Sequence, residues 1–292
     1  MQTTSADGAN AVEIVAPREQ TVPFVFASPH SGSAYPPEFL RMAALDPVAL
    51  RRSEDLFVDR LFSAVVERGA PLLRALFPRA FLDPNREPYE LDPFMFEDRL
   101  PGFANTSSPR VAAGFGTIPR LVADGAGIYA GKLRYAEAER RIRNLYHPYH
   151  RHLTALVEGT RERFGHCVLV DCHSMPSVGG PMDHDSGAAR VDFVLGDRHG
   201  ASCAPALVAV AEAVLRGEGY RVARNDPYAG GFTTRHHGQP AQGVHALQIE
   251  INRKLYVDEV TYRPLPDMAR LQAAITRLVD ALMAVPSMDL QT

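Results

Sequence analysis

The stretch His166-Cys167-Val168-Leu169-Val170-Asp171-Cys172-His173-Ser174-Met175-Pro176 decides the fold class. An apolar run after Gly165 predicts a strand buried on both faces, and the polar residues arrive only where the run ends. Residues two apart in an extended segment share a face, so Asp171 and His173 point one way and Cys172 the other. Because ligands bind at the carboxyl ends of strands in open α/β sheets, His173 is a candidate metal ligand.

Length and composition predict one large α/β domain with loop insertions. The chain has 292 residues, of which 46% are hydrophobic and 22% are charged, which is ordinary for a globular protein. The formal net charge of −3 and the pI near 6.4 do not supply the basic footprint of a protein that binds nucleic acid or an anionic membrane. We therefore expect the partner to be a small molecule.

Cysteine content and hydropathy predict a cytoplasmic protein. The chain contains three Cys, a small and odd number that suits a reducing compartment rather than a disulfide framework. Residues 1–10 are polar and lack an apolar core of signal-peptide length. No apolar run approaches the roughly 20 residues that a membrane helix requires.

The domain organisation follows from where regular patterns begin and stop. Residues 1–20 are predicted to be a polar lead-in, and residues 21–292 a single domain. Residues 87–131 are rich in Pro and Gly and are predicted to form a long loop insertion. Loops of this length usually carry function or form a lid.

A second histidine follows a predicted strand at 22–27. That strand stops at Ser28-Pro29-His30-Ser31-Gly32, so His30 lies just past a strand end, in a turn whose Pro and Gly fix the backbone. A single histidine in such a place usually only caps the turn. Two histidines at two strand ends favour a shared site.

An acidic pair lies within a helical pattern predicted over 37–69. Ser53 can cap the helix while Glu54 and Asp55 favour its positive end, which explains the pair without any function. Alternatively, one of the two carboxylates is a metal ligand. Asp55 and Asp59 are four apart and share a face, so one could bind the metal while the other orients a neighbour.

A cluster of polar residues follows in a segment, 77–86, that we interpret as a strand running into a turn. Arg79 and Asp83 would share one face of this strand, and Asn85 and Arg86 come directly after. Two arginines near a strand end suggest recognition of a carboxylate by the planar guanidinium group. A surface cluster of ion pairs is the alternative.

The second half of the chain alternates between predicted helices and strands. The helices are expected at 135–164, at 206–216 and within 255–282, and the strands at 191–196, 220–224 and 244–253. A glycine-rich loop after 220–224 offers a further arginine, Arg235. Glu250 lies inside an otherwise apolar strand, where a carboxylate is costly unless it is paired or working, so we assign it as the general base.

These residues together match the parts of a catalytic zinc site. Two histidines and one acid provide three protein ligands and leave an open position for water, while Glu250 remains to accept a proton. The chain has no His-Glu-x-x-His, Cys-x-x-Cys or Gly-x-Ser-x-Gly segment, which argues against helix zincins, structural zinc and serine hydrolases. Cys172 is disfavoured as a nucleophile because it faces away from His173.

Four motifs, taken together and in this order, resemble the N-formylglutamate amidohydrolase family. They are Ser28-Pro29-His30-Ser31-Gly32, Asp83-Pro84-Asn85-Arg86, Asp171-Cys172-His173-Ser174-Met175 and Gln248-Ile249-Glu250-Ile251-Asn252-Arg253. The resemblance implies a three-layer α/β/α sandwich with a mixed central sheet, of the phosphorylase/hydrolase-like type also found in zinc carboxypeptidases and aspartoacylase.

The resemblance also implies roles for individual residues. His30 and His173 match the histidines that bind one Zn²⁺ ion, and Asp55 matches the carboxylate ligand, although the adjacent Glu54 remains an alternative. Glu250 matches the catalytic glutamate, and Arg79 the arginine that stabilises the oxyanion. The resemblance also implies that Arg86 holds the substrate carboxylate with the help of Asn85. Arg235, the arginine of the glycine-rich loop, is a further candidate for binding that carboxylate.

The implied activity is hydrolysis of a small anionic N-acyl amino acid, such as N-formylglutamate, to formate and the free amino acid. The long insertion after Arg86 departs from the family pattern and leaves the identity of the N-acyl amino acid open. A zinc carboxypeptidase or amidase that acts on peptides or cell-wall fragments, and a non-catalytic binding module of the same fold, are the alternatives.

Overall fold

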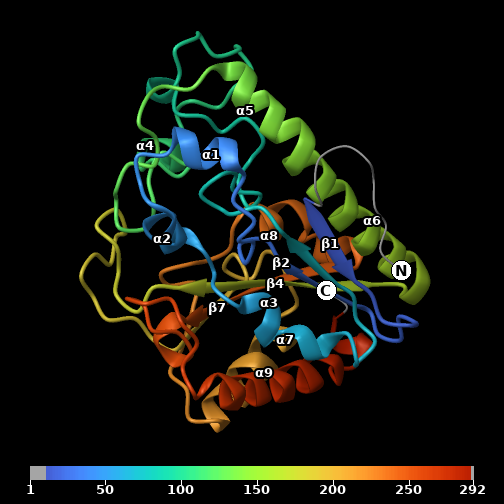
Figure 1. The fold of residues 1–292 in the computed structure, drawn as a ribbon. Helices are drawn as coiled ribbons and strands as arrows, with labels where there is room; N and C mark the ends of the chain where they lie inside the picture. Colours follow the sequence, from blue (N-terminus) through green and yellow to red (C-terminus); the bar gives the residue numbers. More distant parts are fainter. Residues whose placement is uncertain (1–10, 291–292) are drawn as a thin grey trace.

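A mixed sheet of seven strands runs through the computed structural model, which describes residues 11–290 (Figure 1). The order across the sheet is β1-β3-β2-β4-β7-β5-β6. β1 is antiparallel to β3 and β5 to β7, whereas the other neighbours are parallel. The strands are β1 (Val12–Val15), β2 (Phe24–Ser28), β3 (Leu72–Ala75), β4 (Cys167–Met175), β5 (Phe193–Gly196), β6 (Val222–Arg224) and β7 (Val244–Asn252).

Helices cover both faces of this sheet. Figure 1 shows α5 and α6 on one side, and α7 and α9 on the other. The helices are α1 (Pro37–Met42), α2 (Pro47–Leu50), α3 (Val58–Leu61), α4 (Pro109–Ala112), α5 (Tyr135–Arg141), α6 (His147–Phe164), α7 (Pro205–Gly217), α8 (Phe232–His237) and α9 (Met268–Met283). The predicted three-layer α/β/α architecture with a mixed sheet is confirmed.

The alternation of side chains along β4 explains how one strand serves both layers. Val170 and Cys172 pack into the core shared with α3, α7 and α9, whereas Leu169 faces the core beneath α5 and α6. β4 pairs with β7 along its full nine-residue length, and both strands are completely buried. This register sets His173 beside Glu250.

The helical pattern predicted over 37–69 is confirmed only as short helices, and the helix face that Asp55 and Asp59 were expected to share does not form. The segment forms α1, α2, the 3-10 turn η1 (Arg51–Ser53), α3 and the 3-10 turn η2 (Ser63–Val65) instead. Apolar residues that recur every three or four positions can be buried by a series of short turns as well as by one helix. Pro47 begins a new helix, α2, and does not continue α1. Asp55 therefore lies between η1 and α3, not on a helix face.

The strand predicted over 77–86 is also wrong. The strand in this region is β3, which ends at Ala75, and Pro78 and Pro84 lack the N–H groups that a strand ladder needs. Arg79 and Asp83 thus lie in turns. The polar lead-in predicted for 1–20 contains β1, an edge strand antiparallel to β3, while residues 1–10 lie outside the described residues.

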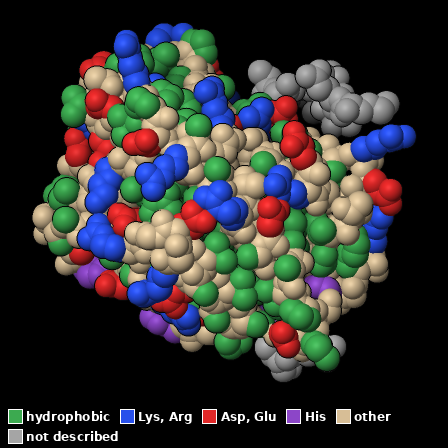
Figure 2. All heavy atoms as spheres, turned by 90° about the horizontal axis from the view of Figure 1, so that it is seen from below, with side chains coloured by type: hydrophobic (Ala, Val, Ile, Leu, Met, Phe, Trp, Pro, Cys, Tyr) green, Lys and Arg blue, Asp and Glu red, His purple; other side chains and the backbone are tan. Residues whose placement is uncertain are grey.

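The insertion at 87–131 forms mostly loops and turns, with only η3 (Pro93–Met95) and α4 as helical segments. It has buried apolar residues of its own, such as Val122 and Ile128, which pack with Phe39 and Phe81. None of the described helices combines the length and the apolar character that a membrane span requires. Figure 2 shows basic and acidic side chains interspersed over the face seen from below.

Candidate active site

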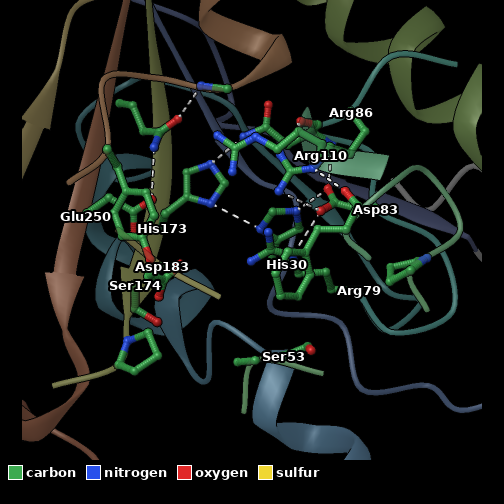
Figure 3. Close-up of a pocket in the computed structure, with 18 of the residues that line it drawn as sticks. His30, Ser53, Arg79, Asp83, Arg86, Arg110, His173, Ser174, Asp183 and Glu250 are labelled. Atoms are coloured by element: carbon green, nitrogen blue, oxygen red, sulfur yellow. Dashed lines mark hydrogen bonds and ion pairs between the residues drawn. The ribbon is translucent and has the colours of Figure 1, made fainter. Parts of the chain in front are cut away.

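A cavity of about 110 Å³ opens where the carboxyl ends of β2, β4 and β7 meet (Figure 3). His30 follows the end of β2, His173 lies near the end of β4, and Glu250 near the end of β7. All three side chains line the cavity. The switch from apolar to polar residues at the ends of buried strands thus brings together groups that are far apart in the sequence.

His30, Asp55 and His173 meet at one point of this cavity wall. Nδ1 of His173 lies 3.2 Å from Nδ1 of His30 and 3.0 Å from Oδ2 of Asp55, and Nδ1 of His30 lies 3.2 Å from the same Asp55 oxygen. All three residues are buried. Asp55 is brought here by its backbone N–H, which donates to the carbonyl of His30 at 3.0 Å.

Two further aspartates fix the orientation of both imidazole rings. Nε2 of His30 lies 2.8 Å from Oδ1 of Asp83, and Nε2 of His173 lies 2.9 Å from Oδ2 of Asp171. A carboxylate on the far nitrogen holds a ligating histidine in one orientation and increases its basicity. Both rings are therefore held with Nδ1 toward Asp55.

The three converging atoms fit a divalent metal ion. Ligand atoms at about 2.0–2.1 Å from a tetrahedral ion lie about 3.3 Å apart, close to the separations of 3.0–3.2 Å between these atoms. The local field also favours positive charge. Burial opposes it, but Asp171 and Asp55 raise the pKa of His173 well above its usual value.

Arg253 determines which oxygen of Asp55 faces the histidines. Its Nη2 donates to Oδ1 of Asp55 at 3.1 Å, which leaves Oδ2 for the cluster. Glu54, the alternative ligand, points elsewhere, because its two oxygens accept from Tyr35 and Arg51. The structure thus places Asp55, and not Glu54, beside the histidines.

Glu250 is buried on the cavity wall next to His173. It is the register partner of His173 on the neighbouring parallel strand, and Nε2 of Gln248 donates to its Oε1 at 2.9 Å. Burial raises the pKa of Glu250 to about 7. A carboxyl group with a pKa near neutrality can both accept and return a proton at physiological pH.

Two arginines share Asp83 at the edge of the cavity. Nε of Arg79 donates to Oδ2 of Asp83 at 3.0 Å, and Nη2 of Arg86 lies 3.5 Å from the same oxygen. The two Nη groups of Arg79 have no hydrogen-bond partner among the described residues, whereas Arg86 donates to the backbone carbonyls of Phe115 and Asn85. The Asn85 amide lies against Asp171 and His173, at 3.2 and 3.1 Å.

Comparison with known proteins decides the family. The family model for N-formylglutamate amidohydrolase matches residues 22–257. The chain is 31% identical to N-formylglutamate deformylase of Pseudomonas aeruginosa, covering 93% of this chain and 97% of the relative. It belongs to the N-formylglutamate amidohydrolase family. The predicted family membership, and with it the amidohydrolase class, is confirmed.

Other relatives agree with this family assignment. N-formylglutamate deformylase of Pseudomonas putida is 28% identical over 90% of this chain and 93% of its own length. The crystal structure of N-formylglutamate amidohydrolase from Ralstonia eutropha superposes with a TM-score of 0.85 at 39% identity, covering 94% of this chain and 97% of that one. A gene product of Agrobacterium tumefaciens shares the fold with a TM-score of 0.69 at 20% identity.

One predicted site residue of this family member lies away from the cavity. Arg235 is on α8, its side chain is 47% exposed, and it forms an ion pair with Glu87. It is not among the residues that line the cavity. The seven other predicted site residues either line the cavity or belong to the histidine–aspartate cluster: His30, Asp55, Arg79, Asn85, Arg86, His173 and Glu250.

The structure adds site residues for which the sequence predicts no role. Asp83 and Asp171 hold the two histidines, and Arg253 holds Asp55. All three residues belong to the motifs that carry the family resemblance. Their place in these motifs was the one feature of the sequence that could have pointed to a role in the site. Arg110 and Tyr228 also line the cavity, and no sequence pattern marked them.

Proposed function

We propose that this protein is a zinc-dependent hydrolase that releases formate from N-formylglutamate. The observation that carries the proposal is the convergence of Nδ1 of His30, Nδ1 of His173 and Oδ2 of Asp55 beside the buried Glu250. Membership in the N-formylglutamate amidohydrolase family supports the choice of substrate. This set of ligands matches catalytic zinc sites, in which three protein groups leave one position open.

His30, Asp55 and His173 would hold the zinc ion. When bound, zinc acts as a Lewis acid and lowers the pKa of water toward about 7. Asp83 and Asp171 keep the imidazole rings in the ligating orientation, and Arg253 keeps Asp55 to a single ligating oxygen.

Glu250 acts as the base and then as the acid. Its carboxylate accepts a proton from the attacking water and passes that proton to the amide nitrogen, so that the C–N bond breaks and the amino acid leaves with a neutral amine. The pKa of about 7 suits both steps. Gln248 donates to Oε1 of Glu250, which leaves Oε2 to accept the proton.

Two arginines serve the substrate. The free Nη groups of Arg79 donate hydrogen bonds to the formyl oxygen as negative charge develops on it. Arg86, held by the carbonyls of Phe115 and Asn85, binds the α-carboxylate and orients the formyl group. Asn85 contributes indirectly, since its side chain lies against Asp171 and His173.

The test is formate release from N-formylglutamate by the purified protein. We expect turnover by the zinc-loaded protein, loss of turnover after chelation, and recovery when zinc is returned. A panel of short peptides and cell-wall fragments tests the peptidase alternative. Turnover of these peptides without turnover of N-formylglutamate would contradict the proposal, and so would a protein that binds zinc and hydrolyses neither class.

A further inference from the structure

Arg110 lines the cavity but has no role in the proposed hydrolysis. Arg110 lies on α4, in the insertion at 87–131, and its side chain lines the same cavity as His173 and Glu250. Figure 3 labels Arg110 beside Arg86, on the Asp83 side of the cavity. Arg110 is exposed to solvent, so a bound substrate could reach it from the cavity.

The backbone that carries Arg110 is held firmly. The Arg110 carbonyl accepts from the N–H of Phe115 at 2.8 Å, and the Phe115 carbonyl accepts from Nε of Arg86 at 2.8 Å. The Oγ of Ser108 caps α4 by accepting from the N–H of Val111 at 3.0 Å. A Cβ at Gly116 would lie 2.2 Å from the carbonyl oxygen of Glu90. The turn after Arg110 is therefore packed closely against its surroundings.

The other cavity arginines already have carboxylate partners. Arg79 and Arg86 share Asp83, and Arg253 is paired with Asp55. Among the described residues, no carboxylate lies within ion-pair distance of Arg110. Of the other two acids that line the cavity, Asp183 is paired with Arg190 and Glu250 accepts a hydrogen bond from Gln248.

The positive charges of Arg86 and Arg110 are close enough to oppose each other. Burial, with the charges of Arg110 and Arg79, lowers the pKa of Arg86 to about 10, against the opposing effect of Asp83. Two guanidinium groups that line one cavity are stabilised by an anionic ligand that carries a carboxylate for each of them.

We propose that Arg110 binds the side-chain carboxylate of the substrate and makes the enzyme selective for N-formyl amino acids with two carboxylates. This rests on the proposed function, in which Arg86 binds the α-carboxylate. Phe115 and Leu121, which also come from the insertion and line the cavity, offer apolar surface to the methylene groups between the two carboxylates. The insertion thus supplies the selectivity of the site, whereas the residues proposed for its chemistry lie outside the insertion.

The experiment compares kcat/KM for N-formylglutamate and for N-formylglutamine, which has the same shape but no side-chain charge. Charge-assisted hydrogen bonds contribute about 10- to 100-fold in binding. We expect the wild-type protein to prefer N-formylglutamate by a factor in this range, and Arg110→Gln to remove most of that preference, chiefly through KM. Arg110→Lys keeps part of it, because one charge remains without the planar fork.

Arg99→Gln is the matched control, because Arg99 is an exposed arginine of the same insertion that does not line the cavity. We expect it to keep the wild-type preference. A wild-type preference near one, or the same preference in Arg110→Gln as in the wild type, would overturn the assignment of Arg110 and leave the proposed function standing. A wild-type protein that hydrolyses neither compound would overturn both.

Discussion

The edge of the sheet and the insertion at 87–131 build the same cavity in different ways. On the sheet side, β4 and β7 pair over nine completely buried residues, so the positions of His173 and Glu250 are set by the strand ladder. On the insertion side, Arg110 is carried by the four-residue helix α4 within loops. Two of the groups proposed for the chemistry, His173 and Glu250, are thus on buried, paired strands, whereas the group proposed for selectivity is on a loop segment outside the sheet.

The largest effect should come from removing a metal ligand on the sheet side. Replacing His173 with Ala takes away one of the three converging atoms and leaves Asp171 without its histidine partner. We expect zinc to be lost and turnover to fall by more than about 10⁴-fold, because the Lewis acid is lost with the metal. Metal analysis of the dialysed protein and the formate assay measure both. His152→Ala, at an exposed position of α6, should change neither, and zinc retained in His173→Ala would remove this residue from the site.

The next effect separates the proposed base from the metal ligands. Glu250→Gln keeps the size and the hydrogen-bonding shape of the side chain but cannot accept a proton. We expect kcat to fall by about 10²- to 10⁴-fold, which is the usual contribution of a general base, with the zinc content unchanged. Normal turnover by this variant would refute the role of Glu250, whereas loss of zinc would mean that Glu250 is itself a ligand.

A smaller effect is expected at Arg253, which donates a hydrogen bond to the Asp55 oxygen that does not contact the histidines. Arg253→Gln frees Oδ1 of Asp55 from the hydrogen bond at 3.1 Å and leaves the carboxylate less well oriented. We expect zinc affinity to weaken by about 10- to 100-fold, as is typical for residues that orient a metal ligand. Competition with a chromogenic chelator measures the affinity. Arg51→Gln is the control, because Arg51 pairs with the neighbouring Glu54, and an equal loss in both variants would contradict a specific role for Arg253.

The smallest effect concerns stability rather than turnover. Burial raises the pKa of Glu250 from 4.5 to about 7. Between these two pH values, the Glu250 carboxyl group is protonated in the folded, metal-free protein but ionised in the unfolded chain. The resulting stability is fully present below pH 4.5 and is lost as the pH rises to about 7. Glu250→Gln avoids this loss. We compare the unfolding free energy of the metal-free variant with that of the metal-free wild type at pH 4.5 and at pH 8. We expect the variant's advantage to be larger at pH 8 by on the order of 1–3 kcal/mol.

Urea unfolding of both metal-free proteins at the two pH values tests this expectation. If the difference in unfolding free energy between the variant and the wild type is the same at both pH values, burial does not raise the pKa of Glu250. That result would remove one reason for assigning a function to Glu250, because the cost of burying a carboxylate is the reason to expect that β7 keeps it for catalysis.

The sequence was sufficient for the parts of the site that lie on long buried strands. The apolar runs before His30 and His173 and the alternation around Glu250 predicted strands whose ends meet, and β2, β4 and β7 confirm them. The period of two also placed Cys172 on the face opposite His173, and Cys172 packs in the core on that side. In these strands, burial and periodicity point to the same structure.

The sequence was misleading where short turns replace regular elements. The spacing of apolar residues in 37–69 suited a helix, but Asp55 is positioned by a backbone hydrogen bond to His30 that no local pattern reveals. Arg79 and Asp83 come together in a turn, not on a strand face. Arg110 could not be recognised at all, because its role depends on how a long loop folds back over the cavity, and loop paths are set by tertiary contacts.

The most direct test of the metal site is a crystal structure of the zinc-loaded protein with anomalous diffraction recorded at the zinc absorption edge. We expect a single strong peak within bonding distance, about 2.0–2.2 Å, of Nδ1 of His30, Nδ1 of His173 and Oδ2 of Asp55, with Glu250 facing its open side. A zinc-loaded crystal without a peak at this position, or with its peak on other residues, would contradict the proposed mechanism.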